Sequence, residues 1–144
     1  MNEEELQYSM EMYHIPVEID DIFSCVNGVE YLLDRFGMKR GVIVHTKDYA
    51  MYVGDASGLE IEKGMVYGSL MATARAAFGE YGNDAQIRNI LEGSLSRTGL
   101  ENLKKIENSS LSGRVILVPT FELDRPKYTI GLGDCFTGGV QLCF

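Results

Sequence analysis

The sequence has few of the residues on which small secreted or metal-stabilised proteins depend. Among its 144 residues there is no tryptophan, and there are only three cysteines, three prolines and two histidines. The cysteines, Cys25, Cys135 and Cys143, are odd in number and show no paired spacing, so we expect reduced thiols in a cytoplasmic protein. Neither His14 nor His45 has a cysteine or histidine neighbour at ligand spacing, which argues against a structural zinc site.

Long apolar runs and an excess of positive charge are also missing. No run approaches the roughly 18–20 residues needed to span a bilayer, and the first residues, Met-Asn-Glu-Glu-Glu, lack the features of an export signal. Thirteen basic against twenty-one acidic residues give a formal net charge of −8, which disfavours nucleic-acid binding. We therefore expect neither a nucleic-acid nor a membrane partner. A small phosphorylated ligand is still compatible, because a local nest of backbone N–H groups can hold it.

The residues that are present predict one α/β domain. Apolar residues make up 45% and charged residues 24% of a 16.0 kDa chain, as is typical of globular proteins. Small residues at 68, 69 and 72 indicate a buried helix packed closely against a sheet. Apolar periodicity predicts helices at 3–13, 19–36, 64–78, 86–94 and 100–106, and strands at 41–46, 49–53, 114–118 and 128–130. Helices interspersed with buried strands indicate an α/β sheet.

The most informative segment is TIGLGD, residues 129–134, followed by an apolar end. A strand, Gly-x-Gly-Asp and a helix starting at or near Asp134 would form an anion hole for a phosphoryl group, with Asp134 able to accept a hydroxyl proton. The alternative is an ordinary glycine turn with Asp134 as helix N-cap. Neither the dinucleotide fingerprint GxGxxG nor the phosphate loop GxxxxGK[ST] is present. Gly138 and Gly139 within the helix cost about 1–2 kcal/mol relative to alanine, which indicates close backbone packing.

Three separated segments carry a family resemblance. They are Asn2–Glu5, of the form Asn-x-x-Glu, the strand and turn Val44–Ala50, and the stretch from Val118-Pro-Thr120 through Pro126 to Asp134. In order and approximate separation they resemble the C-terminal part of the ADP-dependent sugar kinases, the ADP-specific phosphofructokinases and glucokinases of the ribokinase-like superfamily. The resemblance implies a ribokinase-like (Rossmann-like) three-layer sheet with helices on both faces, represented by its C-terminal half.

The resemblance also implies roles for residues of the glycine turn. Asp134 matches the general base that activates the sugar hydroxyl. Gly131, Leu132 and Gly133 match the anion hole. The loop over residues 120–129 would flank the adenine, largely through backbone contacts.

The two remaining segments match the nucleotide and metal sites of the family. His45 and Thr46 lie where the family's strand ends over the nucleotide phosphates, and Glu5 with Asn2 matches the group that positions Mg²⁺. Each assignment has a structural alternative. His45 would otherwise be a hydrogen-bonded histidine at a strand end, and Asn2 and Glu5 would belong to a solvated acidic first turn.

The front of the chain departs from the family pattern, because the Asn-x-x-Glu motif begins at residue 2. Residues 1–144 are therefore expected to be the C-terminal part of a nucleotide-binding and catalytic domain, without the sugar-binding lid and the N-terminal half. The expected ligands are ADP, Mg²⁺ and a sugar or sugar phosphate. The expected protein partner is a second copy or the missing half. The expected function is that of the catalytic portion of an ADP-dependent sugar kinase, which would be inactive alone. One alternative is a non-catalytic nucleotide-binding or interaction module. Another is a ribokinase-like enzyme that uses ATP.

Overall fold

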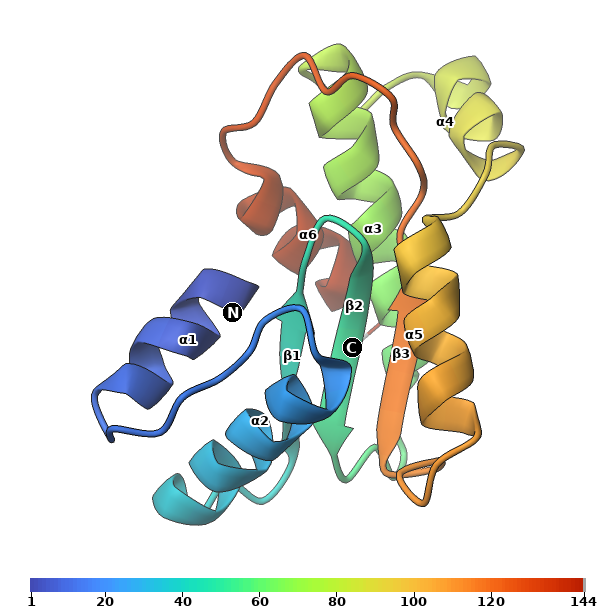
Figure 1. Cartoon of the computed structure of the whole chain (residues 1–144). Coiled ribbons are helices and arrows are strands. Elements are labelled where there is room, and N and C mark those ends of the chain that lie inside the picture. The colour runs from blue at the N-terminus through green and yellow to red at the C-terminus, as the bar shows by residue number, and fades with distance from the viewer. Residues whose placement is uncertain (144) are drawn as a thin grey trace.

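The computed structural model describes residues 1–143 as a small sheet covered by helices (Figure 1). The helices and strands follow the predicted order closely. They are α1 (Glu3–Glu11), α2 (Ile22–Phe36), β1 (Gly41–His45), β2 (Tyr49–Gly54), α3 (Ile61–Phe78), α4 (Asp84–Leu91), α5 (Arg97–Glu107), β3 (Val115–Pro119) and α6 (Leu132–Gln141). Within these residues, no helix is both long enough and apolar enough to cross a membrane.

The three strands pair in the order β1-β2-β3, and both pairings are antiparallel. Ala50 in β2 lies opposite His45 on one side and Val118 on the other. The parallel pairing of a Rossmann-like sheet appears, in the part of the chain described, only as two isolated bridges, Asn2 with His45 and Ser112 with Val115. The α/β class is therefore confirmed, while the sheet itself is a small antiparallel one.

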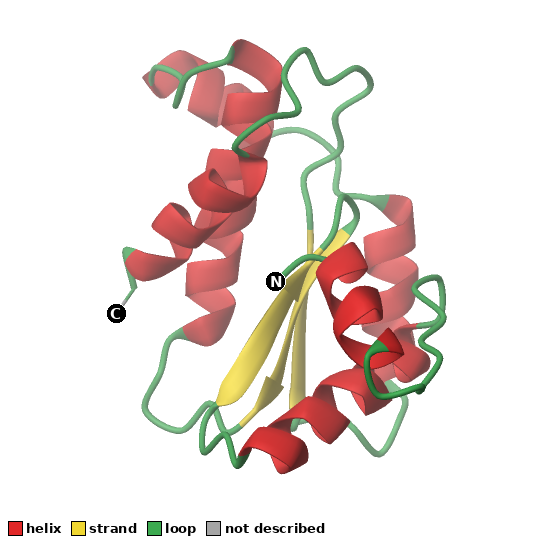
Figure 2. Ribbon diagram, turned by 90° about the vertical axis from the view of Figure 1, so that its left-hand side faces the viewer, coloured by secondary structure: helices red, strands yellow, loops and turns green. Residues whose placement is uncertain are grey.

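Side chains that alternate along the strands bury both faces of this sheet. On β2, Tyr49, Met51 and Val53 join the core formed with α1, α2 and α5, whereas Ala50 and Tyr52 join the core formed with α3 and α6. Helices therefore cover the two faces, as the turned view also shows (Figure 2). The candidate site lies on the α3 and α6 side.

Helices α3 and α6 pack closely through glycines. A Cβ atom on Gly139 would lie 2.6 Å from the Tyr67 carbonyl oxygen and 2.7 Å from Gly68 Cα, and one on Gly68 would meet Phe136 at 2.8 Å. A Cβ on Gly138 would meet nothing within 4 Å. The expected close packing is thus confirmed for Gly139 and not for Gly138. The glycine at 68 serves the contact with α6, rather than the approach to the sheet that the small residues of α3 predicted.

The segment before α6 corrects the strand predicted over residues 128–130 and excludes the alternative of Asp134 as helix N-cap. Residues 128–130 do not form a strand, and Ile130 is 83% exposed. This segment packs on α3 instead of pairing with the sheet, since the N–H of Tyr128 donates to the carbonyl of Ala76. The helix then begins at Leu132 with Gly131 as its N-cap, at a φ of 77° that favours glycine. Asp134 lies in the first turn and is not the N-cap.

Candidate functional site

A cavity of about 490 Å³ opens where the sheet, α3, α6 and the segment after β3 meet. Its walls come from segments far apart in the sequence: the turn after β1, one stripe of α3, the start of α6 and the loop that follows β3. The lining residues are Glu3, His45, Thr46, Lys47, Asp48, Ser69, Ala72, Thr73, Ala76, Ser96, Thr120, Phe121, Glu122, Leu123, Pro126, Leu132 and Phe136. The predicted loop over residues 120–129 therefore does border a cavity.

His45 connects the sheet to α6 at this cavity. Its ring stacks against Phe136, with ring centroids 4.8 Å apart, and its Cε1 would lie 3.4 Å from a Cβ on Gly133. Burial and, secondarily, the N-terminal ammonium group lower the pKa of His45, against an opposing effect of Glu5. At neutral pH the imidazole is therefore mostly uncharged, so that one ring nitrogen donates a hydrogen bond and the other accepts one.

The glycine turn presents backbone N–H groups near that imidazole. Gly131, the N-cap of α6, makes no side-chain capping hydrogen bond, so the first N–H groups of α6 have no side-chain acceptor. Leu132 lines the cavity, and Gly133 lies next to the ring of His45. An anion placed here would meet unpaired donors and the positive end of the α6 dipole.

Asp134 follows this turn and is exposed. It is not among the residues that line the cavity, although its neighbour Leu132 in the same first turn of α6 is. Because no helix cap involves it, the structure removes the N-cap alternative for Asp134. The Asp134 carboxylate makes no helix-capping hydrogen bond and follows the glycine turn directly in the sequence. Such a carboxylate is suited to accept a proton from a bound hydroxyl.

Asn2 and Glu5 form a reciprocal capping box at the start of α1. The Asn2 side chain accepts from the N–H of Glu5, and a Glu5 carboxylate oxygen accepts from the N–H of Asn2, both at 2.8 Å. The structural alternative for this pair is thus real. The capping box also holds the Glu5 carboxylate near the end of β1, because Asn2 forms a β-bridge with His45.

A magnesium ion fits this arrangement in one limited way. Among residues 1–143 there is no group of three histidine, cysteine, aspartate or glutamate side chains able to hold a metal. However, Mg²⁺ usually keeps several waters and takes one or two carboxylates together with substrate phosphates. The Glu5 carboxylate is oriented by its capping box but is exposed and does not line the cavity, so it would reach such an ion through the ion's water molecules.

The turn between β1 and β2 is held by side chains that the sequence reasoning assigned differently or missed. The Thr46 hydroxyl accepts from the N–H groups of Asp48 and Tyr49 at 3.0 Å, so it has a structural role in the turn. The Ser96 hydroxyl donates to the Asp48 carboxylate at 2.8 Å, and that of Thr120 donates to the carbonyl of Lys47 at 2.6 Å. This network joins the cavity walls contributed by the turn, α5 and β3.

Further cavity residues escaped the sequence reasoning. Burial raises the pKa of Glu3, which lines the cavity near the turn. On α3, Ser69, Ala72, Thr73 and Ala76 recur at three- and four-residue steps and all line the cavity. That spacing is visible in the sequence, but it also fits a helix face buried against a sheet, so it could not identify a cavity.

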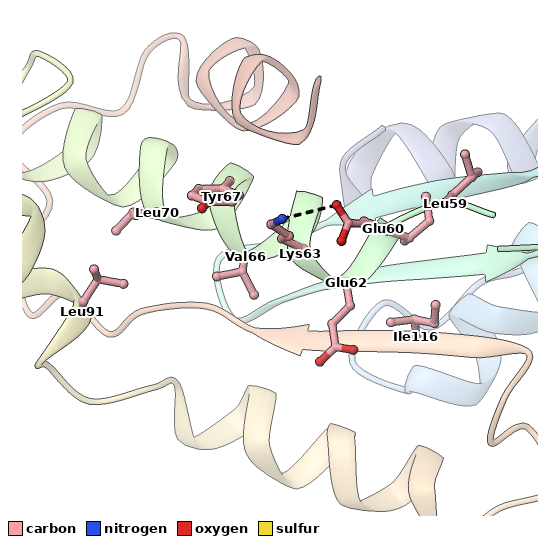
Figure 3. Close-up of a pocket in the computed structure, with 10 residues that line it drawn as sticks. Leu59, Glu60, Glu62, Lys63, Val66, Tyr67, Leu70, Leu91 and Ile116 are labelled. Atoms are coloured by element: carbon pink, nitrogen blue, oxygen red, sulfur yellow. Dashed lines mark hydrogen bonds and ion pairs between the residues drawn. The ribbon is translucent and has the colours of Figure 1, made fainter. Parts of the chain in front are cut away.

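A second cavity, of about 620 Å³, lies between α3 and β3 on the other side of the helix (Figure 3). Val66, Leu70, Leu91 and Ile116 give it apolar walls, and an ion pair between Lys63 and Glu60, 3.3 Å apart, lies along it. It lacks the glycine turn and the histidine.

The three cysteines are all free, as expected, with Cys25 buried.

Comparisons with known proteins bear on the whole arrangement. No family model matches the chain. The chain is 25% identical over 123 residues to the ADP-dependent glucose/glucosamine kinase of Pyrococcus abyssi, covering 79% of this chain and 27% of that kinase. The chain thus spans about a quarter of the length of this curated relative.

Solved structures show the same fold. A phosphofructokinase from Pyrococcus horikoshii OT3 with AMP is similar at a TM-score of 0.77 and 22% identity, over 99% of this chain and 35% of that one. An ADP-dependent kinase in complex with fructose 6-phosphate and ADPβS is similar at a TM-score of 0.71 and 23% identity, over 96% of this chain and 35% of that one. Together these likenesses confirm that the chain resembles a fragment of the ADP-dependent sugar kinase family, as its three sequence segments indicate.

Proposed function

We propose that the chain is the C-terminal nucleotide-binding and catalytic portion of a kinase that transfers the β-phosphoryl group of ADP to a hydroxyl of glucose or fructose 6-phosphate. The observation that carries this proposal is that His45 and the uncapped start of α6 lie together at one cavity. The kinship to ADP-dependent sugar kinases supplies the substrate class.

The diphosphate would bind at the glycine turn. N–H groups at Gly131, Leu132 and Gly133 would donate to phosphoryl oxygens, and their charge stabilisation would increase as negative charge develops in the transition state. The neutral His45 imidazole would add one donor from the strand end. The loop that contains Phe121, Leu123 and Pro126 offers an apolar wall for the adenine.

Asp134 would act as the general base. It would take the proton of the sugar hydroxyl while that oxygen forms a bond to the β-phosphorus of ADP. The bond from the β-phosphorus to the bridging oxygen would break, and AMP would leave with that oxygen. An exposed carboxylate beside the anion site suits this role, because the sugar must approach from outside the cavity.

Glu5, oriented by its capping box with Asn2, would hold water molecules of a nucleotide-bound Mg²⁺. When bound, the metal would neutralise charge on the diphosphate. Glu5 also raises the His45 pKa against the effect of burial, so the metal and phosphate groups would share one electrostatic environment.

The sugar lid and the first half of the nucleotide-binding domain would come from elsewhere, either another polypeptide or a longer form of this chain. This proposal is consistent with the chain covering about a third of the solved relatives. The chain alone would then bind ADP without phosphorylating a sugar. A cytoplasmic location is proposed with it, because the substrates are metabolites of the cell interior.

Two measurements test the proposal. Titration calorimetry with ADP and Mg²⁺, run in parallel with ATP, should show binding that favours ADP. A coupled sugar-kinase assay should then show turnover only after the missing half is restored. Binding that persists without turnover in the restored protein would favour the alternative of a non-catalytic nucleotide-binding module. No binding of ADP would overturn the proposed function.

A further inference from the structure

Ser69 carries a buried hydroxyl that makes no hydrogen bond. The residue is 1% exposed, and its Oγ is the one buried side-chain oxygen or nitrogen without a partner among the described residues. A helical serine commonly donates to the carbonyl four residues earlier, which this hydroxyl does not do. Buried polar groups are nearly always paired, so an unpaired one in a cavity wall calls for an explanation.

The position of Ser69 supplies that explanation. It lies in the cavity-lining stripe of α3, next to Gly68, which packs against Phe136. Phe136 in turn stacks on His45, and His45 lies beside Gly133. Ser69 is therefore at the end of the cavity where the glycine turn and the histidine are found.

The opposite end of the stripe belongs to the loop after β3. Ala76 lies seven residues further along α3, about 10 Å along the helix axis. Its carbonyl accepts from the N–H groups of Lys127 and Tyr128, which close the loop that contains Pro126. A nucleotide placed along the stripe would have its phosphates near Ser69 and its base near the loop.

We propose that the Ser69 hydroxyl is a ligand-binding group that donates a hydrogen bond to a phosphate oxygen of the nucleotide bound in this cavity. The proposal rests on the proposed function, since it assumes that the cavity binds ADP. The unpaired hydroxyl disfavours the empty state and gains its partner when the diphosphate is bound, which increases the affinity for the nucleotide.

The test compares Ser69→Ala with Ser24→Ala. Ser24 lies in α2 on the other face of the sheet, and its hydroxyl accepts from the N–H of Glu18 at 3.0 Å. Both changes remove one hydroxyl from a helix, but only Ser24 loses a hydrogen bond of the empty protein. Without nucleotide, Ser69→Ala should therefore melt at the same temperature as the unmodified protein or higher, and Ser24→Ala lower.

Calorimetry on the same proteins with ADP, AMP and adenosine completes the test. Ser69→Ala should weaken ADP binding about tenfold, as expected for a hydrogen bond to a charged group, and leave adenosine binding unchanged. Ser24→Ala should leave both unchanged. A lower melting temperature for Ser69→Ala, or unchanged ADP affinity, would overturn the inference. An equal loss with adenosine would overturn the assignment to phosphate. If the unmodified protein binds no ADP, the proposed function itself fails.

Discussion

The contact between α3 and α6 is the feature on which the geometry of the glycine turn depends most directly. Replacing Gly139 by alanine would place a Cβ atom 2.6 Å from the Tyr67 carbonyl oxygen and 2.7 Å from Gly68 Cα. Both obstacles are backbone atoms, so no side-chain rotation can relieve the overlap. We expect α6 to move away from α3 and to carry the first turn, including Asp134, with it.

The magnitude follows from two opposing terms. In a helix interior, alanine raises the free energy of unfolding by about 1 kcal/mol relative to glycine. Overpacking against a rigid backbone costs typically about 1–3 kcal/mol, and a double backbone overlap belongs at the upper end. The net expectation for Gly139→Ala is a loss of roughly 2 kcal/mol of unfolding free energy.

Gly138→Ala is the matched control, because a Cβ there would meet nothing within 4 Å and Gly138 is exposed. In this variant only the higher helix propensity of alanine operates, so its free energy of unfolding should rise by about 1 kcal/mol. Urea unfolding followed by circular dichroism measures both, and ADP calorimetry should show weaker binding for Gly139→Ala alone. If both variants are stabilised equally, α6 does not pack on α3 through Gly139, and the position of the glycine turn over the cavity has no support.

Three further predictions concern the site and the surface. Asp134→Asn should leave stability and ADP affinity nearly unchanged but lower the rate of the restored enzyme by about 10²–10⁴-fold in a coupled assay; full activity would exclude the general base. The pKa of His45 is lowered in the folded protein, so the unfolded state binds more protons and stability should fall as the pH drops through about 6.5; a melting-temperature profile that is the same for His45→Gln would contradict this. Exposed apolar residues such as Met12, Phe36 and Leu142, at 79%, 57% and 71% exposure, should promote self-association, and sedimentation showing a strict monomer at all concentrations would refute it.

Local patterns in the sequence were sufficient for most of the secondary structure. The apolar period of α2 and its terminal Gly37, which has a φ of 61°, are short-range signals that predict both the helix and its end. The β-branched runs of β1 and β3 are equally local. The strand predicted over residues 128–130 was wrong, because that segment's hydrogen-bond partner is decided by tertiary contact with α3.

The candidate site could be predicted only in part, because its walls meet through long-range contacts. The Gly-x-Gly-Asp turn was identified from its own residues and His45 through the family resemblance, and the structure brings His45 to Gly133. Ser69 and Thr73 could not be singled out, since a small residue facing a cavity and one facing a sheet have the same helical spacing. Whether these residues face a cavity or the sheet depends on where α6 packs.

Residues of the site differ in how clearly their functional roles can be separated from structural ones. Asn2, Glu5 and Thr46 already bind one another or the turn, so their substitution would change folding and ligand binding together. Ser69 and Asp134 have no such bond in the structure. The Ser69 hydroxyl lacks a partner in the empty fold, and the Asp134 carboxylate contributes to it only through the dipole of α6. Conservative replacement of either side chain, Ser69→Ala or Asp134→Asn, therefore tests function with little change in folding, so that a loss of binding or rate reports a lost contact with the ligand.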